Sequence, residues 1–232
     1  MGDNPMDAMD SLVRIFYEIP GKLIFLHKDE HLFYEGDEAK YFYFVRSGQI
    51  CITKSADSGR MLSLRLACQG SVIGEQPLFQ ASPMYIFNAV AKTASEVYAI
   101  ELPVLERYLE KKPQFAVGLL KLLSQHMRKQ HSKFRDLVLY GKKGALYSTL
   151  IRLANSYGRP DPEGIVIPIP FTNQDLANYS ATTRESMNRM LSELRRDGVV
   201  DYKDRLILIR DIAFLRREIQ CENCPREVCN IE

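Results

Sequence analysis

Residues 172–198, TNQDLANYSATTRESMNRMLSELRRDG, decide the fold of this chain. Thr172 is followed three residues later by Asp175, a capping pair that predicts a helix over residues 173–179. Ser180-Ala181 then forms a turn before a second helix begins. Two capped helices joined by so short a turn are typical of a helix-turn-helix, in which the second helix enters the major groove of DNA.

The second helix begins with Thr182 and Glu185, a pair that predicts a cap at Thr182, and it ends at Asp197-Gly198. Its apolar residues recur at helical spacing and are expected to face inward: Met187, Met190, Leu191 and Leu194. Residues 199–209 then form two strands around Lys203-Asp204. A hairpin after the second helix makes the arrangement a winged helix-turn-helix.

The start of the second helix supplies side chains that recognise bases. Arginine pairs with guanine, a carboxylate accepts from cytosine, and asparagine reaches adenine or phosphate. The expected base-contacting residues are Thr183, Arg184, Glu185, Ser186, Asn188 and Arg189. Contacts to phosphate are expected from Thr172, Arg195, Arg196 and Lys203. The alternative is that these residues only cap and cover a solvated helix, but the surrounding fold favours DNA binding.

Basic residues are concentrated in the same half of the chain. Residues 121–218 contain 18 Lys and Arg against 11 Asp and Glu, whereas the whole chain has a net charge of only +2. Such a basic block favours an anionic partner, and nucleic acid is the obvious candidate.

The composition is ordinary for a soluble globular protein. The 232 residues are 46% hydrophobic and 26% charged, which is enough for one large or two ordinary domains. No apolar run approaches the roughly 20 residues of a membrane span. The first residues carry no signal pattern, so we expect a cytoplasmic protein without a membrane partner. No GxGxxG, P-loop or nucleophile–histidine–acid signature occurs, so the sequence predicts a protein that is not an enzyme.

Residues 22–100 consist of short runs rich in β-branched and aromatic residues, separated by turns that contain glycine. The runs are 23–26, 41–45, 49–52, 61–64 and 86–90. Many short strands at regular spacing predict a β-barrel or sandwich. A short helix over residues 7–18 is expected to precede them, because its apolar residues recur at helical spacing.

Beyond Pro113 the apolar period lengthens to that of a helix, which continues to Tyr140-Gly141. Its seam positions alternate by three and four: Leu120, Leu123, Met127, Gln130, Phe134 and Leu137. Such a seam predicts pairing with a second copy in a homodimer. The alternative is that the helix packs on its own β-domain, but its polar flanking residues favour dimerisation.

Smaller elements surround the helix-turn-helix. After a hinge at Gly141–Gly144, residues 145–157 carry an apolar face and form a helix. Residues 165–169 form a short strand, which we place at a sheet edge because it contains Pro168. After the hairpin, an amphipathic helix is expected to dock near the DNA-binding domain through Ile212, Leu215 and Ile219.

Three of the five cysteines fall within nine residues in a C-x₂-C-x₄-C spacing: Cys221, Cys224 and Cys229. In a reducing compartment, clustered thiolates favour metal binding or redox chemistry. The spacing leaves open an iron–sulfur cluster, a zinc site completed by His126 or His131, and a disulfide between the first two cysteines. Cys51 and Cys68 lie in predicted strands and are interpreted as small buried hydrophobic residues.

A β-rich domain, a long pairing helix and a winged helix-turn-helix in this order resemble the cAMP receptor protein/FNR superfamily of bacterial transcription regulators. The matching segments are FYEGD at 33–37, YFVRSG at 43–48, IGE at 73–75, AKTA at 91–94 and RESMNR at 184–189. The resemblance implies an α+β fold with an N-terminal double-stranded β-helix (jelly-roll, cyclic-nucleotide-binding-like) domain. The implied segments are this domain over 1–112, a dimerisation helix over 113–141, a winged helix-turn-helix over 142–210, and a cysteine-bearing tail over 211–232.

Within the superfamily, FRDL at 134–137, GKKGALY at 141–147 and the terminal cysteines resemble the FNR proteins of bacilli. This implies an oxygen-responsive activator of anaerobic respiration and fermentation genes, with one oxygen-labile [4Fe–4S] cluster per chain. The implied ligands are Cys221, Cys224, Cys229 and Asp136. The resemblance also implies a homodimer that reads a TGTGA-type palindrome through Arg184, Glu185 and Arg189, and that contacts RNA polymerase.

Asp136 is assigned as a ligand only by this resemblance, since the residues alone favour a surface ion pair with Lys133. Its position two residues after the seam residue Phe134 directs it away from a partner helix and leaves it available to the tail. A cluster joining the tail to this helix near Gly141–Gly144 would bias the arrangement of the DNA-binding domains. Loss of the cluster in oxygen would then break this tether.

cAMP is not expected as the effector. In cAMP-binding members of the family, an Arg-Ser pair shortly after a Gly-Glu motif holds the cyclic phosphate. Gly74-Glu75 is present here, but residues 83–87 are PMYIF, which supplies no cation. A buried phosphate without a counter-charge is strongly disfavoured.

Overall fold

The computed structural model describes residues 16–57 and 59–232. They divide into two compact units, one made of residues 16–54 and 64–123 and the other of the remaining described residues. The helix expected over 7–18 lies largely outside the described residues, and Phe16–Glu18 at its end is helical. Among the described residues, none of the helices combines the length and the apolar composition that a membrane crossing requires.

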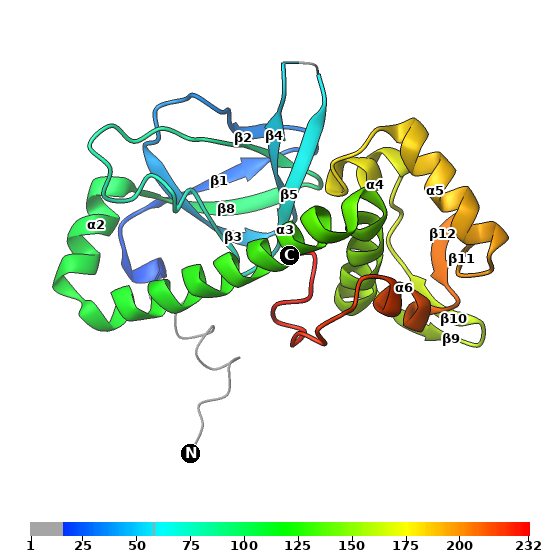
Figure 1. The fold of residues 1–232 in the computed structure, drawn as a ribbon. Coiled ribbons are helices and arrows are strands. Elements are labelled where there is room, and N and C mark those ends of the chain that lie inside the picture. The colour runs from blue at the N-terminus through cyan, green and yellow to red at the C-terminus, as the bar shows by residue number, and fades with distance from the viewer. Residues whose placement is uncertain (1–15, 58) are drawn as a thin grey trace. The chain divides into compact units, whose positions relative to one another are not determined.

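The β-rich part of the chain forms two four-stranded sheets, in the orders β1-β8-β3-β6 and β2-β7-β4-β5 (Figure 1). The strands are β1 (Lys22–Leu26), β2 (His31–Phe33), β3 (Tyr41–Ser47), β4 (Ile50–Ser55), β5 (Met61–Ala67), β6 (Val72–Ile73), β7 (Asn88–Ala91) and β8 (Ser95–Glu101). Neighbours such as β1 and β8, or β4 and β7, run antiparallel. This confirms the predicted N-terminal β-domain.

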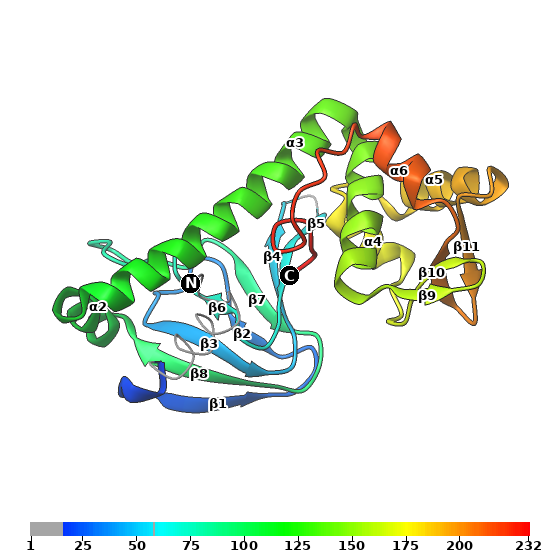
Figure 2. The same cartoon turned by 90° about the horizontal axis from the view of Figure 1, so that it is seen from below.

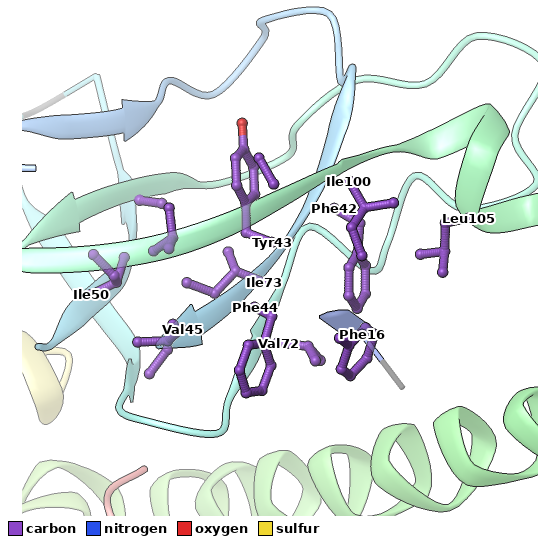
Figure 3. Packing of buried hydrophobic residues seen from close by; sticks show 14 of the residues in the cluster. Phe16, Phe42, Tyr43, Phe44, Val45, Ile50, Val72, Ile73, Ile100 and Leu105 are labelled. Atoms are coloured by element: carbon purple, nitrogen blue, oxygen red, sulfur yellow. The ribbon is translucent and has the colours of Figure 1, made fainter. Parts of the chain in front are cut away.

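An aromatic group forms the centre of this unit. The ring of Phe16 stacks on Phe42 and Phe44, with centroids 5.5 and 5.3 Å away (Figure 3). Strand β3 is buried at four successive residues, Phe42–Val45. A strand covered on both faces needs a continuous apolar run rather than an alternating one. The sequence YFYFV therefore suits the interior position of β3 in its sheet.

Helix α2 (Leu102–Lys111) closes the β-domain and was not predicted from the sequence. It buries Leu102, Leu105 and Leu109, which are spaced by three and four residues. Pro103 lies in its first turn, where the missing N–H removes no helical hydrogen bond. The apolar residues of α2 recur over only ten residues, directly after a strand. So short a run is not enough to distinguish helical spacing from that of the strand before it.

Helix α3 (Pro113–Tyr157) continues through the hinge that the sequence predicts at residues 141–144. The break is confined to Gly141, whose φ of 62° and ψ of −156° are not helical. Gly144 is helical but crowded, because an added Cβ would lie 2.2 Å from the Cβ of Tyr140 and 2.8 Å from the carbonyl oxygen of Asp136. Gly141 is thus needed for its backbone angles and Gly144 for its small size.

The second unit contains the predicted helix-turn-helix, α4 (Asn173–Tyr179) and α5 (Arg184–Arg196). Its sheet has the order β11-β12-β10-β9, with β9 at Arg159–Asp161 and β10 at Gly164–Ile167. The predicted edge position of β10 is wrong, because this strand pairs with β12 on one side and with β9 on the other. Pro168 follows the last residue of the strand, so its missing N–H does not interrupt the ladder.

The turn between α4 and α5 differs from the prediction by one residue. Thr183, rather than Thr182, caps α5 and accepts a hydrogen bond from the Ser186 amide at 3.3 Å. Ser180 keeps a negative φ of −105° and is fully buried. The left-handed angle falls instead on Ala181, with a φ of 49°. The turn therefore needs no left-handed backbone angle at Ser180 itself.

The predicted wing is present as β11 (Val200–Lys203) and β12 (Leu206–Ile209). Asp204 and Arg205 form its two-residue turn, and both have left-handed backbone angles, with φ of 52° and 66°. Positive φ at both central residues is typical of the tight hairpin turns that match the twist of antiparallel strands.

The chain ends with α6 (Ile212–Glu218) and an irregular tail that lies beside α3 (Figures 1 and 2). The core of the second unit includes Leu215 and Ile219, which confirms the predicted apolar face of this helix. The same core includes Cys229 and Ile231 from the tail. The cysteine motif is therefore packed into the unit that carries the helix-turn-helix.

Candidate DNA-binding surface and cysteine site

Helix α5, which the sequence predicts to enter the major groove, has one buried and one exposed face. Its buried residues are those that the sequence predicts to face inward: Met187, Met190, Leu191 and Leu194. Of the predicted base-contacting residues, Thr183, Arg184, Glu185, Asn188 and Arg189 are exposed and Ser186 is half-buried. The helix therefore presents its polar side chains away from the core, as groove binding requires.

Glu185 lies in the first turn of α5. Its carboxylate accepts a hydrogen bond from its own backbone N–H and another from the Thr183 hydroxyl, and these lower the pKa of Glu185 below its usual value. The carboxylate is therefore ionised at neutral pH and available as a hydrogen-bond acceptor. This is the state needed to accept from cytosine N4.

Asn188 is held in place by a relay of hydrogen bonds. The sequence alone did not reveal this relay. The Asn173 amide donates to the side-chain oxygen of Asn188 at 2.6 Å, and the Tyr202 hydroxyl donates to the side-chain oxygen of Asn173 at 3.1 Å. The relay joins α4, α5 and the wing. Only the polar character of these residues is visible in the sequence, since they are far apart along it.

The side chains expected at phosphate have partners within the unit. Arg195 lies 3.5 Å from Asp201, Arg196 lies 3.3 Å from Asp197, and Lys203 lies 2.7 Å from Asp161. Thr172 caps α4, and its hydroxyl donates to Asp175 at 2.6 Å. These surface pairs are weak, so phosphate can compete for the cations.

The long helix α3 carries an exposed apolar stripe. Leu120, Met127 and Phe134 are 65%, 59% and 67% exposed, whereas the alternate seam positions Leu123 and Leu137 are half-buried. Large apolar side chains at this spacing are seldom left in water along one helix. The stripe is the surface on which the sequence predicts a second copy.

The three tail cysteines line one cavity of about 200 Å³. The other lining residues are Ile151, Asn155, Arg216, Asn223 and Arg226. Burial raises the pKa of the Cys229 thiol, and its neighbours Cys221 and Cys224 raise it further, while Arg152 opposes the shift. The sequence prediction that these three thiols lie together is therefore consistent with the structure.

Asp136, the predicted fourth ligand, is buried in a separate set of contacts. Its Oδ1 accepts from Nε and Nη2 of Arg135 at 3.0 and 2.6 Å. Its Oδ2 accepts from the Ser148 hydroxyl at 2.5 Å and lies 3.6 Å from Nη2 of Arg152. Asp136 thus has one half-buried and one buried arginine partner, and it is not among the residues that line the cavity.

Arg135 connects this network to the tail, because its Nη1 lies 2.6 Å from Oε1 of Glu222. Burial lowers the pKa of Arg135, but hydrogen bonds to Asp136 and Glu222 outweigh it and raise the pKa overall. Glu222 stands between Cys221 and Cys224 in the motif. The long helix and the cysteine motif therefore contact each other through Arg135.

The donor set suits a thiolate-bound metal group. Neither His126 nor His131 lines the cavity, so the geometry does not favour a zinc site completed by histidine. In the part of the chain that the structure describes, no cysteine is joined to another by a disulfide. Within the described residues, no three His, Cys, Asp or Glu side chains converge closely enough to hold a single metal ion. A four-iron cluster is bound through several irons, so its thiolates need to surround a space rather than meet at a point.

The side chains of the β-domain leave a small cavity between them. It has a volume of about 10 Å³, and its lining includes Phe33, Gly74, Glu75 and Tyr85. A cation does reach it, contrary to the interpretation of residues 83–87 alone, because Arg65 of β5 also lines it. That guanidinium donates to the Val72 carbonyl at 2.6 Å and lies 3.4 Å from Glu75.

Comparison with known protein families matches both units. Residues 23–112 match the cyclic nucleotide-binding domain family, and residues 144–218 match the Crp-like helix-turn-helix domain family. The chain is 45% identical over 208 residues to the anaerobic regulatory protein of Bacillus subtilis, covering 89% of this chain and 87% of that protein. It is 26% identical to the global nitrogen regulator of Synechococcus elongatus, over 88% of this chain and 96% of that one.

The fold also matches solved structures. The c-di-GMP responsive global regulator CLP of Xanthomonas campestris superposes with a TM-score of 0.77 at 22% identity, covering 87% of this chain and 99% of that chain. FixK2 of Bradyrhizobium japonicum superposes with a TM-score of 0.70 at 20% identity, covering 86% and 97% of the two chains. Each match covers more than four fifths of this chain, so the chain shares its fold with both structures.

Proposed function

Because the chain belongs to the cAMP receptor protein/FNR family of transcription regulators, we propose that it adjusts the transcription of anaerobic respiration and fermentation genes to oxygen. The observation that carries the proposal is the shared cavity of Cys221, Cys224 and Cys229 in the unit that holds the helix-turn-helix. The similarity to a relative called an anaerobic regulatory protein supports the same role. We place the protein in the cytoplasm, with its DNA.

The proposed target is a palindrome with TGTGA-type half-sites. Arg184 and Glu185 stand exposed at the start of α5, where base edges are contacted, and Arg189 follows one turn later. Arginine pairs with guanine and glutamate accepts from cytosine, so together they suit a G·C-containing half-site. Asn188 is already oriented by Asn173, which reduces the ordering needed on binding.

A palindromic site requires a two-fold symmetric protein. The exposed stripe with Leu120, Met127 and Phe134 on α3 gives each chain a self-complementary apolar surface. A homodimer formed along this helix would bury the stripe, and its two recognition helices would address half-sites one helical turn apart. RNA polymerase is the further partner that transcription activation needs.

The proposed sensor is one [4Fe–4S] cluster per chain held by the three cysteines, with Asp136 as the predicted fourth ligand. When bound, such a cluster supplies reactivity toward oxygen that no side chain of this protein has. Asn155 and Arg216 border the same cavity and can donate hydrogen bonds to an anionic sulfur centre. Asp136 would have to exchange its arginine and serine partners to act as a ligand.

The position of the cysteine motif supports an influence of the motif on DNA binding. The tail packs on α3 and α6 within the unit that carries α5. A change in the tail therefore acts on the helix whose backbone turns at Gly141. We propose that the state of the cysteine motif biases the DNA-binding arrangement of the dimer.

The test is an anaerobic purification with iron, acid-labile sulfide and zinc quantified. About four irons and four sulfides per chain, with a visible absorbance that bleaches in air, are expected for a [4Fe–4S] protein. Stoichiometric zinc or a metal-free protein would contradict the oxygen-sensor proposal and leave a zinc or thiol-based switch as the alternative.

The matched variants are Cys224→Ser and Cys68→Ser, which each remove one cysteine. Cys224→Ser should lose the iron, whereas Cys68→Ser, which alters a β-domain residue outside the cavity, should retain it. Affinity for a TGTGA palindrome is then compared between cluster-loaded and cluster-free protein. Equal affinity in the two states would contradict the proposed control of DNA binding.

A further inference from the structure

Arg152, in the second half of α3, is buried to an unusual degree for an arginine, with 2% of its side chain exposed. Its Nε donates to the Ser148 hydroxyl at 3.1 Å, and its Nη2 donates to the Ser132 hydroxyl at 2.8 Å. Its Nη1 donates to the backbone carbonyl of Val228 at 2.9 Å. Every nitrogen of the guanidinium therefore has a partner, which is what allows the charge to be buried.

The Val228 contact holds the cysteine motif by its backbone. Val228 immediately precedes Cys229, whose own carbonyl accepts from the Asn155 amide at 2.8 Å. Two residues later, the Ile231 amide donates to the hydroxyl of Ser156 at 3.0 Å. One stretch of α3 thus binds three positions of the tail, and these contacts involve no thiol.

The contact of Arg152 with the tail is stronger than that of Arg135. Arg135 binds Glu222, but that carboxylate is 62% exposed, so water competes for the pair. Val228 is buried, and its carbonyl accepts from a charged donor. A hydrogen bond from a charged donor in a buried place is stronger than a surface pair, and losing it leaves a carbonyl unsatisfied.

We propose that Arg152 is a positioning residue that seats the cysteine motif on α3 before any metal is bound. Asp136 balances the charge of Arg152, so the predicted ligand and the backbone of the motif share one buried cation. The role of the seated thiols rests on the proposed function, but the seating itself does not. Loss of a cluster would then leave the tail in place, rather than releasing it as a broken tether would.

Amide hydrogen exchange of the metal-free full-length protein, kept in chelator, tests the seating. The backbone amides of Val228, Cys229 and Ile231 all donate hydrogen bonds in the seated tail. In Arg152→Met, exchange in a peptide covering 221–232 should be about tenfold or more faster, as expected for loss of a hydrogen bond from a charged donor. Exchange in a peptide covering α5 should stay unchanged.

Three further variants make the test selective. Arg128→Met removes an exposed arginine of the same helix and should leave tail exchange as in the unaltered chain. Glu222→Gln removes the exposed contact to Arg135 and should change the exchange rate of the tail by no more than about fivefold. Asp136→Asn combined with Arg152→Met leaves no uncompensated buried charge, so it keeps the test valid where the single variant fails to fold.

Each outcome decides the matter. Faster exchange confined to the tail in Arg152→Met and in the double variant supports the proposal. Unchanged tail exchange in the double variant overturns it. An equal increase of exchange in the tail and in α5 also overturns it, because Arg152 would then stabilise the whole unit rather than the tail.

Anaerobic reconstitution with iron and sulfide, followed by visible absorbance, separates this inference from the proposed function. Arg152→Met should form the cluster more slowly than Arg128→Met, because its thiols are not held together beforehand. An unaltered chain that takes up no iron contradicts the proposed function and leaves the exchange result standing. Normal iron uptake in every variant, with unchanged tail exchange, contradicts only the seating by Arg152.

Discussion

The ring of Tyr85 lies flat on the ring of Phe33, with centroids 3.7 Å apart and planes inclined by 13°. The Tyr85 hydroxyl donates to the Tyr41 carbonyl at 2.7 Å, so the ring is held by its polar end as well. Both side chains line the 10 Å³ cavity of the β-domain. That space suits at most a single water molecule and not a nucleotide.

We therefore expect no response to cAMP. The unfolding temperature and the affinity for a TGTGA palindrome should be the same with and without cAMP, because a ligand stabilises a protein only where it binds the folded state. Differential scanning fluorimetry and fluorescence anisotropy measure the two quantities. A melting temperature that rises with cAMP concentration would show that Tyr85 yields its place to the nucleotide.

Arg184→Ala should weaken binding to the TGTGA palindrome by about 1–3 kcal/mol and leave binding to scrambled DNA nearly unchanged. Lys203→Ala is the control for phosphate contact. It should weaken both complexes alike and reduce the salt slope by about one. Anisotropy titrations at several salt concentrations measure both effects, and equal losses on the two DNAs for Arg184→Ala would rule out a base contact.

Met127→Glu should convert the protein to monomers and abolish tight binding to the palindrome, because the charge would be buried in the predicted dimer surface. Met84→Glu places the same charge on an exposed methionine of the β-domain and should leave the dimer intact. Sedimentation velocity of the two variants measures the change. A dimeric Met127→Glu protein would move the interface away from the stripe on α3.

Asp136→Ala should destabilise even the metal-free protein, by about 3–5 kcal/mol, because it leaves Arg152 without its buried counter-charge. Asp136→Asn keeps the shape and should cost less, about 1–3 kcal/mol. Urea unfolding in chelator measures both, with the exposed Asp197→Asn as a control expected to stay within about 0.5 kcal/mol. Loss of iron in Asp136→Ala therefore does not by itself identify a ligand, and a metal-free Asp136→Ala of unchanged stability would contradict this account.

The β-domain should lose stability in alkali. Burial raises the pKa of Tyr43 and of Tyr85 above the ordinary tyrosine value. The unfolded chain therefore ionises first, so the stability from these groups is present below about pH 10 and is lost as the pH rises above it. Tyr43→Phe should lose less stability across this range than the unaltered chain, whereas the exposed Tyr34→Phe should lose the same amount.

Local chemistry made part of this structure predictable. The pair Thr172 and Asp175 is a cap that needs only four residues, and the helix it predicts begins and ends at the observed positions. The apolar residues of α5 face inward as their spacing indicates. The same local logic placed β10 at an edge, because a proline one residue beyond a strand resembles a proline within it.

The contacts that connect distant segments were not predictable in this way. Arg152 and Val228 are separated by 76 positions, and a backbone carbonyl leaves no mark in the sequence. Arg65 reaches the cavity of the β-domain from strand β5, so a search of residues 83–87 could not find it. The resemblance to a family predicts Asp136 as a ligand, whereas its place beside Arg152 is visible only in the structure.

The wing turn carries a cost that a simpler sequence would avoid. Asp204 and Arg205 both adopt left-handed backbone angles. Aspartate tolerates such angles, but for a residue such as arginine they are less favourable by about 1–2 kcal/mol. Asn-Gly would adopt the same turn readily, but it would remove the guanidinium from the tip of the wing. The turn thus exchanges stability for a cation, in a protein whose ligand is a polyanion. Substitutions intended to raise the thermal stability would begin at these two positions, and they would be expected to lower the affinity for DNA.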